Sequence, residues 1–319
     1  MPRPEPEHTL HLAQEHLPDA VRRHLADGAW ERVRRGAYRD APPPGVPPVV
    51  AARTLAVDRA RAVGRGLRRD PVVSHASAAL LHGLPLWELP ATTHVVQPYR
   101  RSGSAARDVT RHVGEVGAED RETVLGVTTT SLVRTVADCL RTMPALDGLV
   151  VADAALARGV RRSEVTAVLD RRPGGRGSRR SRHVLGLADP GAESARETWL
   201  RYVLLRSGLP RPETQVPLRT EVGPVRADLG WPRWRLLLEF DGLVKYRTGP
   251  GGVAPHEDPG RVLVLVREKL RQEAIERTGH RLLRVTARDR PSDVVARVLR
   301  HVPADVVRGL RPDPRLPPV

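Results

Sequence analysis

The apolar positions of the chain switch between a helical and a strand spacing, and this alternation predicts a multi-domain α/β protein. In "SLVRTVADCLRTM" (131–143) and "AESARETWLRYVLLRSGL" (192–209), apolar residues recur three and four positions apart, as they do in amphipathic helices. In "VRADLGW" (225–231) and "WRLLLEFDG" (234–242), short apolar runs flank a turn, which indicates two paired strands. A helix, a strand and a last helix are expected to follow.

Breaks in this pattern divide the chain into segments. A helix ending at Gly28 and a short hairpin around Gly36 precede the Pro-rich "APPPGVPP". Six arginines among the first twelve residues of "RRPGGRGSRRSRHV" suggest a solvated basic linker, with phosphate contact as the alternative. We therefore predict a helix–hairpin module over 1–48, an α+β region over 49–170, a basic linker over 171–190, an α/β domain over 191–302 and a disordered tail over 303–319.

The composition points to a polyanionic partner. The 319-residue chain carries 53 Lys and Arg against 37 Asp and Glu, a formal charge of +16, which favours nucleic acid. A generally basic surface in an Arg-rich proteome is the alternative. Cys139, the single cysteine, allows no internal disulfide and no cysteine-based zinc site. No apolar run approaches the roughly 18 residues that span a bilayer, and the start has no signal-peptide core, so we expect a cytoplasmic protein without membrane contact.

The two strands after residue 224 carry a set of acids with a suggestive spacing. Side chains alternate along a strand, so Glu239 and Asp241 share one face. If "WPRW" (231–234) is the turn, Asp228 faces Leu237 and becomes a diagonal neighbour of Glu239, about 7–8 Å away between α-carbons. Carboxylates at that spacing suit Mg²⁺ or Mn²⁺, which activates water for attack on a phosphodiester. The same spacing equally fits strands whose acids point to solvent and pair with arginines.

Lysine use adds one clue to this interpretation. Only Lys245 and Lys269 among the basic residues are lysine, and both fall in the predicted C-terminal domain. A compact ammonium can sit beside a scissile phosphate where a guanidinium fits poorly. Lys245 follows the turn after Asp241, where it is positioned to stabilise charge in the transition state.

The pieces "ESARETWLR", "QVPLRTEVGPVRADLGWP", "RLLLEFDG" and "EKLRQEAIERTGHRLLRVT" resemble a domain family related to very-short-patch-repair endonucleases, within the PD-(D/E)xK restriction-endonuclease-like fold. The resemblance covers roughly 110 residues by the span of these pieces. It implies an endonuclease domain over 191–302. The family's helix glutamate falls on Glu197, with Glu193 as a weaker candidate, its first-strand aspartate on Asp228, and its next-strand acids on Glu239 and Asp241.

This chain departs from the fold's usual pattern at one important place. The fold expects lysine two residues after the glutamate, where this chain has Asp241, and Lys245 is the candidate to replace it. The resemblance thus implies a Mg²⁺-dependent endodeoxyribonuclease with Asp228, Glu239 and Glu197 as metal ligands. A fold that has lost catalysis and only binds DNA is the alternative. On the helix that follows, Lys269 and Arg271 are candidate phosphate contacts, and a surface pair of Lys269 with Glu273 is the rival role for Lys269.

The N-terminal half carries a second resemblance. "LADGAWERVRRGAYRD", "VVSHASAALLHGLPL", "THVVQP" and "VTTTSLVRTVADCLRT" resemble antitoxins of the abortive-infection (type IV toxin–antitoxin) family, with a first module shorter at its start than in that family. The resemblance implies a winged-helix-like DNA-binding module over 1–48, an antitoxin-like domain over 49–170, a role in transcriptional regulation, and a cognate toxin as partner. The candidate DNA contacts are Arg22, Arg23, Arg32, Arg34 and Arg35, whose other role is a solvated basic face.

Four histidines of the middle region are possible metal ligands. His75 and His82 lie seven residues apart on one predicted helix, and His94 and His112 lie on nearby strands. Because the chain lacks a cysteine partner or an H-x₃-H pair here, we do not expect a metal site among them.

Overall fold

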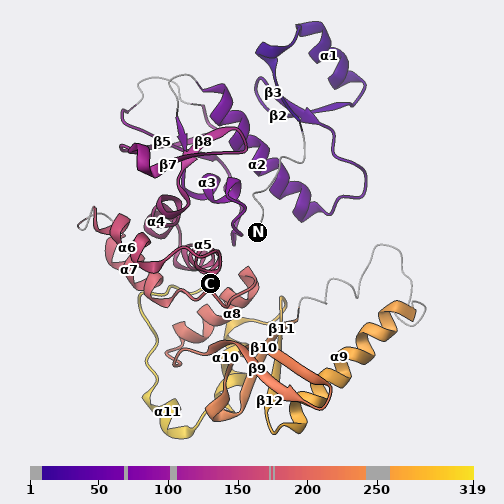
Figure 1. Ribbon diagram of the computed structural model, residues 1–319, viewed down its shortest axis with the longest axis vertical. Coiled ribbons are helices and arrows are strands. Elements are labelled where there is room, and N and C mark those ends of the chain that lie inside the picture. Colours follow the sequence, from indigo (N-terminus) through magenta and orange to yellow (C-terminus); the bar gives the residue numbers. More distant parts are fainter. Residues whose placement is uncertain (1–8, 68–70, 101–105, 172–173, 175–176, 242–258) are drawn as a thin grey trace. The chain divides into compact units, whose positions relative to one another are not determined.

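The computed structural model resolves the chain into two compact units, residues 1–188 and 189–319 (Figure 1). The two units are described separately. The structure describes residues 9–67, 71–100, 106–171, 174, 177–241 and 259–319.

A small three-stranded sheet begins the first unit. Its strands β1 (Leu10–Leu12), β3 (Ala37–Asp40) and β2 (Trp30–Arg34) are hydrogen-bonded in that order, with α1 (Pro18–Ala26) before the β2–β3 hairpin. The predicted helix and hairpin are therefore present. The sheet buries Leu10, Val33 and Ala37 against Ala62 of α2 (Pro48–Gly66), so the N-terminal module shares its core with the helix that follows the Pro-rich break.

A five-stranded mixed sheet forms the centre of this unit. Its strand order is β6-β5-β4-β8-β7, in which β5 and β6 are parallel, β4 and β8 are parallel, and the other pairs are antiparallel. The helix α3 (His75–Leu81) connects β4 to β5 and is buried along its whole length. The strands are β4 (Val72–Val73), β5 (Thr93–Gln97), β6 (Val109–Val113), β7 (Arg121–Val124) and β8 (Val127–Thr130).

Four helices complete the first unit: α4 (Leu132–Thr142), α5 (Ala145–Ala157), α6 (Arg162–Asp170) and α7 (Ser178–Leu187). The segment predicted as a linker over 171–190 instead contains α7, which packs on α4 and α5 and buries Val184 and Leu185. Its arginines contact protein groups: Arg180 donates to the Met143 carbonyl at 2.9 Å, and Arg182 pairs with Asp170. Arg180 and Arg182 thus bind the fold itself, which composition alone did not reveal, whereas Arg179 is exposed.

The second unit is a four-stranded sheet with helices packed around it (Figure 1). The sheet order is β12-β11-β10-β9, with β11 and β12 parallel and the other pairs antiparallel. The elements are α8 (Ala195–Arg206), β9 (Glu213–Thr220), β10 (Gly223–Trp231), β11 (Leu236–Asp241), α9 (Pro259–Arg277), β12 (Arg281–Thr286), α10 (Pro291–Leu299) and α11 (Ala304–Gly309). The edge strand β9 was not predicted as a strand, because it carries Pro217 and alternates only weakly between buried and exposed positions.

The turn between β10 and β11 differs from the predicted one by two residues in register. A 3-10 turn over Pro232–Trp234 and a left-handed Arg235 (φ 51°) connect the strands, so Gly230 pairs with Leu237. A Cβ on Gly230 would lie 2.8 Å from the Leu236 carbonyl oxygen, so this close pairing requires glycine. Because a shift of two residues keeps every side chain on its face, continuing the register places Asp228 directly opposite Glu239, where a diagonal relation was predicted.

The predicted disordered tail over 303–319 is wrong for this segment. Residues 304–309 form α11, Leu316 is 2% exposed, and the Tyr202 hydroxyl donates to the Pro317 carbonyl at 2.8 Å. The low apolar content of "LRPDPRLPPV" concealed a single anchoring leucine. Within the described part of the chain, no helix has the length and apolar character needed to cross a membrane.

Candidate functional site

The predicted carboxylates of the second unit meet at the junction of α8, β10 and β11. Glu197 lies in the first turn of α8, where Ser194 is the N-cap and accepts from the Glu197 amide at 3.2 Å. The glutamate side chain in turn accepts from the Ser194 hydroxyl and from the Glu193 amide, each at 2.8 Å. These bonds hold the largely buried Glu197 carboxylate in one orientation, and burial raises its pKa. The weaker candidate, Glu193, is exposed and lies 3.5 Å from Arg226.

Asp228 is the most perturbed acid of this site. Burial raises the pKa of Asp228 to about 6, and the negative charges of Glu197 and Glu239 add to the shift. A hydrogen bond of 2.7 Å from the Phe240 amide to the Asp228 carboxylate, together with the charge of Arg271, acts in the opposite direction. Burial and the two neighbouring carboxylates thus outweigh the Phe240 hydrogen bond and the charge of Arg271 at Asp228.

Glu239 has a cationic partner in Arg271 of α9. The guanidinium donates to both carboxylate oxygens, at 3.0 Å for Oε2, and also to the Arg226 carbonyl at 2.8 Å. Arg271 stands one helical turn before Ile275, which packs on Leu237 in the core of this unit. The same face of α9 therefore carries both Ile275, which packs in this core, and Arg271, which pairs with Glu239. Arg271 was predicted to contact phosphate, and here it faces inward to the acid.

The carboxylates fit the implied Mg²⁺ only in part. Carboxylate oxygens are the right ligands, and a cation would offset the burial and the neighbouring negative charges that raise the pKa of Asp228. Glu239, however, already binds Arg271 through both oxygens. Within the described residues, the ligand atoms of the three acids do not all approach within 4.8 Å of one another. Asp228 and Glu197 thus offer suitable oxygen ligands, whereas Glu239 becomes available only after Arg271 moves.

The other predicted residues of the second unit are Asp241, Lys245 and Lys269. Asp241 ends β11 opposite Thr286 of β12 and is half-buried. Lys245 lies outside the described residues. Lys269 is exposed, and its Nζ is 3.9 Å from Glu273, so the predicted surface pair is present.

The arginines of the N-terminal module divide into two kinds. Arg23, Arg32 and Arg35 are exposed, and Arg22 is exposed beside Asp19. These four are placed as a solvated basic face would be. Arg34 is different, because its side chain is only 14% exposed and its guanidinium pairs with Asp108 at 2.8 Å. That hydrogen bond holds the pKa of Asp108 below its ordinary value.

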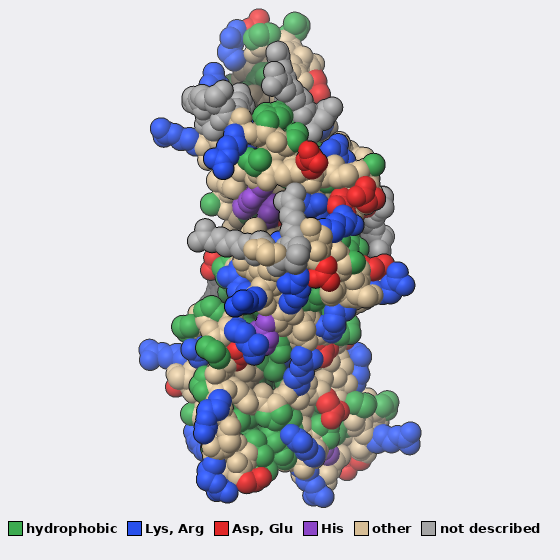
Figure 2. All heavy atoms as spheres, turned by 90° about the vertical axis from the view of Figure 1, so that its left-hand side faces the viewer, with side chains coloured by type: hydrophobic (Ala, Val, Ile, Leu, Met, Phe, Trp, Pro, Cys, Tyr) green, Lys and Arg blue, Asp and Glu red, His purple; other side chains and the backbone are tan. Residues whose placement is uncertain are grey.

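A cavity of about 710 Å³ lies beside the Arg34–Asp108 pair. Four arginines reach its wall, two from the β2–β3 hairpin, one from α2 and one before β6: Arg34, Arg35, Arg59 and Arg107. Among the described residues, Asp108 is the only acid that lines it, so its potential is positive. Elsewhere, basic side chains are spread over the face shown in Figure 2, with acidic ones between them. The cavity therefore concentrates positive charge within one concave surface of the first unit.

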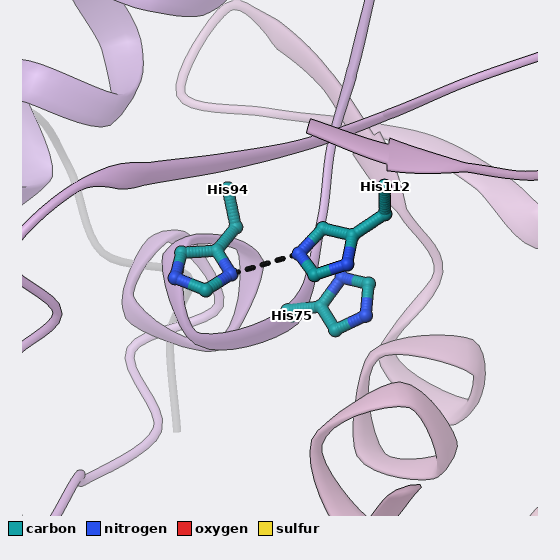
Figure 3. A group of neighbouring side chains, drawn as sticks. All are labelled: His75, His94 and His112. Carbon is teal, nitrogen blue, oxygen red and sulfur yellow. Dashed lines mark hydrogen bonds between the residues drawn. The ribbon is translucent and has the colours of Figure 1, made fainter. Parts of the chain in front are cut away.

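Sequence reasoning missed a cluster of three histidines. His75 at the start of α3, His94 on β5 and His112 on β6 bring one ring nitrogen each to within 4.8 Å of the other two (Figure 3). His82, the fourth histidine considered, instead faces the Thr130 carbonyl at 2.9 Å. The three residues are far apart in sequence and meet only through the β5–β6 pairing and the placement of α3. Their spacing in the sequence therefore does not indicate that they cluster.

Comparison with known proteins gives a limited result. No family model matches the chain. Two curated relatives are each 32% identical to it over 160 residues, which cover 48% of this chain and 54% of the relative: "Uncharacterized protein MT2308" from Mycobacterium tuberculosis (strain CDC 1551 / Oshkosh) and "Uncharacterized protein Rv2248" from Mycobacterium tuberculosis (strain ATCC 25618 / H37Rv). The chain thus spans about half the length of the curated relatives it matches.

Proposed function

We propose that the chain interacts with DNA and that its second unit hydrolyses phosphodiester bonds with a divalent cation, Mg²⁺ or Mn²⁺. The observation that carries this proposal is the burial of Asp228 beside Glu197 and Glu239, which raises the pKa of Asp228 to about 6, chiefly through burial and further through the two negative charges. A polar site that repels its own charges is typical of positions where a protein binds a cation or runs acid–base chemistry. The overall charge of +16 supports a polyanionic substrate.

In this proposal the residues have distinct roles. Asp228 and Glu197 would hold the ion, and the Phe240 amide fixes the orientation of the Asp228 carboxylate. The ion would supply a Lewis acid for the phosphate and lower the pKa of a bound water. Arg271 holds Glu239 in place, and its release from Glu239 would open a further carboxylate ligand. Asp241 and Lys245 keep their predicted roles in completing the shell and in stabilising charge.

A second candidate function is favoured by a specific contact. The bidentate bond between Arg271 and Glu239 provides the positive charge that a metal would otherwise supply at that carboxylate. A site neutralised in this way needs no cation to be stable, which fits a regulator or antitoxin that binds DNA without cleaving it. A cognate toxin and a cytoplasmic location stay predictions in either case.

One experiment separates the two functions. The full chain, an Asp228→Asn variant and an Asp305→Asn variant, whose site is exposed and outside the cluster, are incubated with supercoiled, linear and single-stranded DNA and Mg²⁺ or Mn²⁺. Catalysis predicts cleavage by the wild type and the Asp305 variant, lost in the Asp228 variant. Salt-sensitive DNA binding by all three, without cleavage of any DNA form, supports the non-catalytic function.

A further inference from the structure

The sheet of the first unit brings two histidines together by its register. On the parallel pair β5–β6, His94 pairs with Thr110 and Val96 pairs with His112. Because paired residues share a face and alternate residues return to it, His94 and His112 point to the same side of the sheet. The helix α3 starts directly after β4, the neighbour of β5, and its first residue is His75. Three imidazoles from three elements thus meet on one face.

The distances suit a shared ion. His94 Nδ1 and His112 Nε2 are 3.0 Å apart, and all three candidate nitrogens lie within 4.8 Å of one another (Figure 3). Two nitrogens bound to one tetrahedral zinc at about 2.0–2.1 Å lie about 3.3–3.4 Å apart. The His75 ring stacks on that of His112, with centroids 3.6 Å apart. Since lone pairs lie in the ring plane, ion binding requires one of these two rings to turn edge-on.

The protonation state of the cluster is that of a metal ligand. Burial lowers the pKa of His75 well below its ordinary value and the pKa of His94 to about 4, and the mutual repulsion of the rings adds to both shifts. Burial also lowers the pKa of His112. At neutral pH the three imidazoles are therefore uncharged, which is the form that binds transition metals. Arg134, whose charge also acts on His75, is engaged by Asp120 and Asp138.

Two local features hold His75 in the cluster. Its backbone is left-handed (φ 53°), an uncommon state for a residue with a side chain, and one that tends to persist at functional sites. Its Nδ1 lies 2.9 Å from the Ser74 hydroxyl, a bond that fixes the ring as outer-shell partners of metal-bound histidines do and leaves Nε2 for an ion.

We propose that His75, His94 and His112 bind one divalent first-row transition metal ion, with Zn²⁺ as the default occupant. In the described part of the chain no carboxylate or thiolate joins the group, so its all-nitrogen donor set selects against Mg²⁺ and Ca²⁺. Three protein ligands leave a coordination position for water or a small ligand. This site is independent of the proposed acidic site, with which it shares no residue.

Metal titration of the purified full chain tests the proposal. After treatment with a chelator and dialysis, the protein is titrated with Co²⁺, whose visible absorption reports the coordination geometry, and with Zn²⁺ in competition. We expect one equivalent to bind, and His94→Ala or His112→Ala to weaken binding by more than about 100-fold, since loss of outer-shell partners alone costs 10–100-fold. His301→Ala, at an exposed position, should bind as the wild type does.

The same experiment can overturn the proposal. Absence of stoichiometric Co²⁺ or Zn²⁺ binding by the wild type would do so, as would undiminished binding by the His94 and His112 variants. His11, His16 and His24 gather around Trp30, so His24→Ala controls for binding there. If the cluster variants fail to fold, X-ray absorption of the zinc-loaded wild type decides: three imidazole ligands support the site, and fewer than three contradict it.

Discussion

Arg271 of α9 binds both carboxylate oxygens of Glu239 on β11, so one guanidinium lies against the acid that the sequence assigns to a metal. Glu239 is 10% exposed and Arg271 29% exposed by side chain. A charge pair at this depth is costly to break, because the remaining partner is left partly desolvated. The pair therefore competes with any cation for Glu239.

This competition gives the first prediction. Replacing Arg271 by Ala should raise the affinity of the second unit for Mn²⁺, because the carboxylate loses its rival cation, and should lower the free energy of unfolding without metal by about 1–3 kcal/mol. Isothermal calorimetry and urea denaturation measure the two effects. Lys269→Ala, two residues away and exposed, is the matched control and should change neither by much. Unchanged or weaker Mn²⁺ binding in the Arg271 variant would argue that Glu239 is no metal ligand.

The second prediction concerns the pH dependence of stability. The folded protein holds the Asp228 proton up to a pKa of about 6, whereas the ordinary value is 3.8. Proton binding by Asp228 therefore contributes fully to the free energy of unfolding below about pH 4. This contribution, about 2 kcal/mol after allowance for partial exposure, is lost as the pH rises through 6. Asp228→Asn, whose side-chain oxygen can still accept from the Phe240 amide, should be more stable than the wild type at pH 8 and equal at pH 4.

Denaturation series at several pH values, with Asp305→Asn as the exposed control, measure this difference. Saturating Mn²⁺ should remove the advantage of the Asn variant at pH 8, because the ion favours the charged carboxylate. An Asn variant that tracks the wild type across the whole pH range would refute the assignment of the shift to Asp228.

The sequence predicted the α/β class and most elements, because their apolar periodicity is strong. It also placed Asp228 and Glu239 on neighbouring strands. The two-residue error in the turn left both side chains on the predicted face of the sheet. The turn was wrong because Arg235 adopts a left-handed conformation, which no pattern marks in a bulky residue. Partners that come from another element were beyond prediction: Arg271 and Arg34 were assigned to phosphate, yet their acids lie on other elements.

The third prediction tests a buried charge network that anchors the N-terminal module on α2. Asp58 bonds Arg39 of β3 and Arg61 of its own helix at 3.0 Å each, and the aspartate and Arg39 side chains are both 3% exposed. Asp58→Ala should lower the free energy of unfolding by about 3–5 kcal/mol, since it leaves buried guanidinium charge uncompensated. Thermal and urea denaturation measure the loss. Asp19→Ala removes the exposed pair with Arg22 and should cost less than about 1 kcal/mol.

The fourth prediction separates DNA contacts from structural arginines. Arg35→Ala and Arg32→Ala, both at exposed positions, should weaken DNA binding and reduce the slope of log K against log salt by about 1 each, because each would remove one of the proposed phosphate contacts. Arg34→Ala, adjacent in sequence but paired with Asp108, should mainly lower stability. Fluorescence anisotropy over a series of salt concentrations measures the slopes. Equal slopes for the Arg35 variant and the wild type would show that the β2–β3 hairpin does not contact DNA through Arg35.

The last prediction concerns the C-terminal segment that the sequence marked as disordered. Leu316 is 2% exposed, and the Asp313 amide nearby donates to the Arg206 carbonyl at the end of α8 at 2.9 Å. Leu316→Ala should therefore lower the free energy of unfolding by about 2–4 kcal/mol, the cost of a cavity at a buried leucine. Leu270→Ala, at a leucine 50% exposed on α9, is the control and should cost less than about 1 kcal/mol. Hydrogen exchange locates the effect. If Leu316 anchors the segment, the backbone amides within residues 310–317 lose protection in the Leu316 variant alone. Amides that are already unprotected in the wild type would show that the segment is not held.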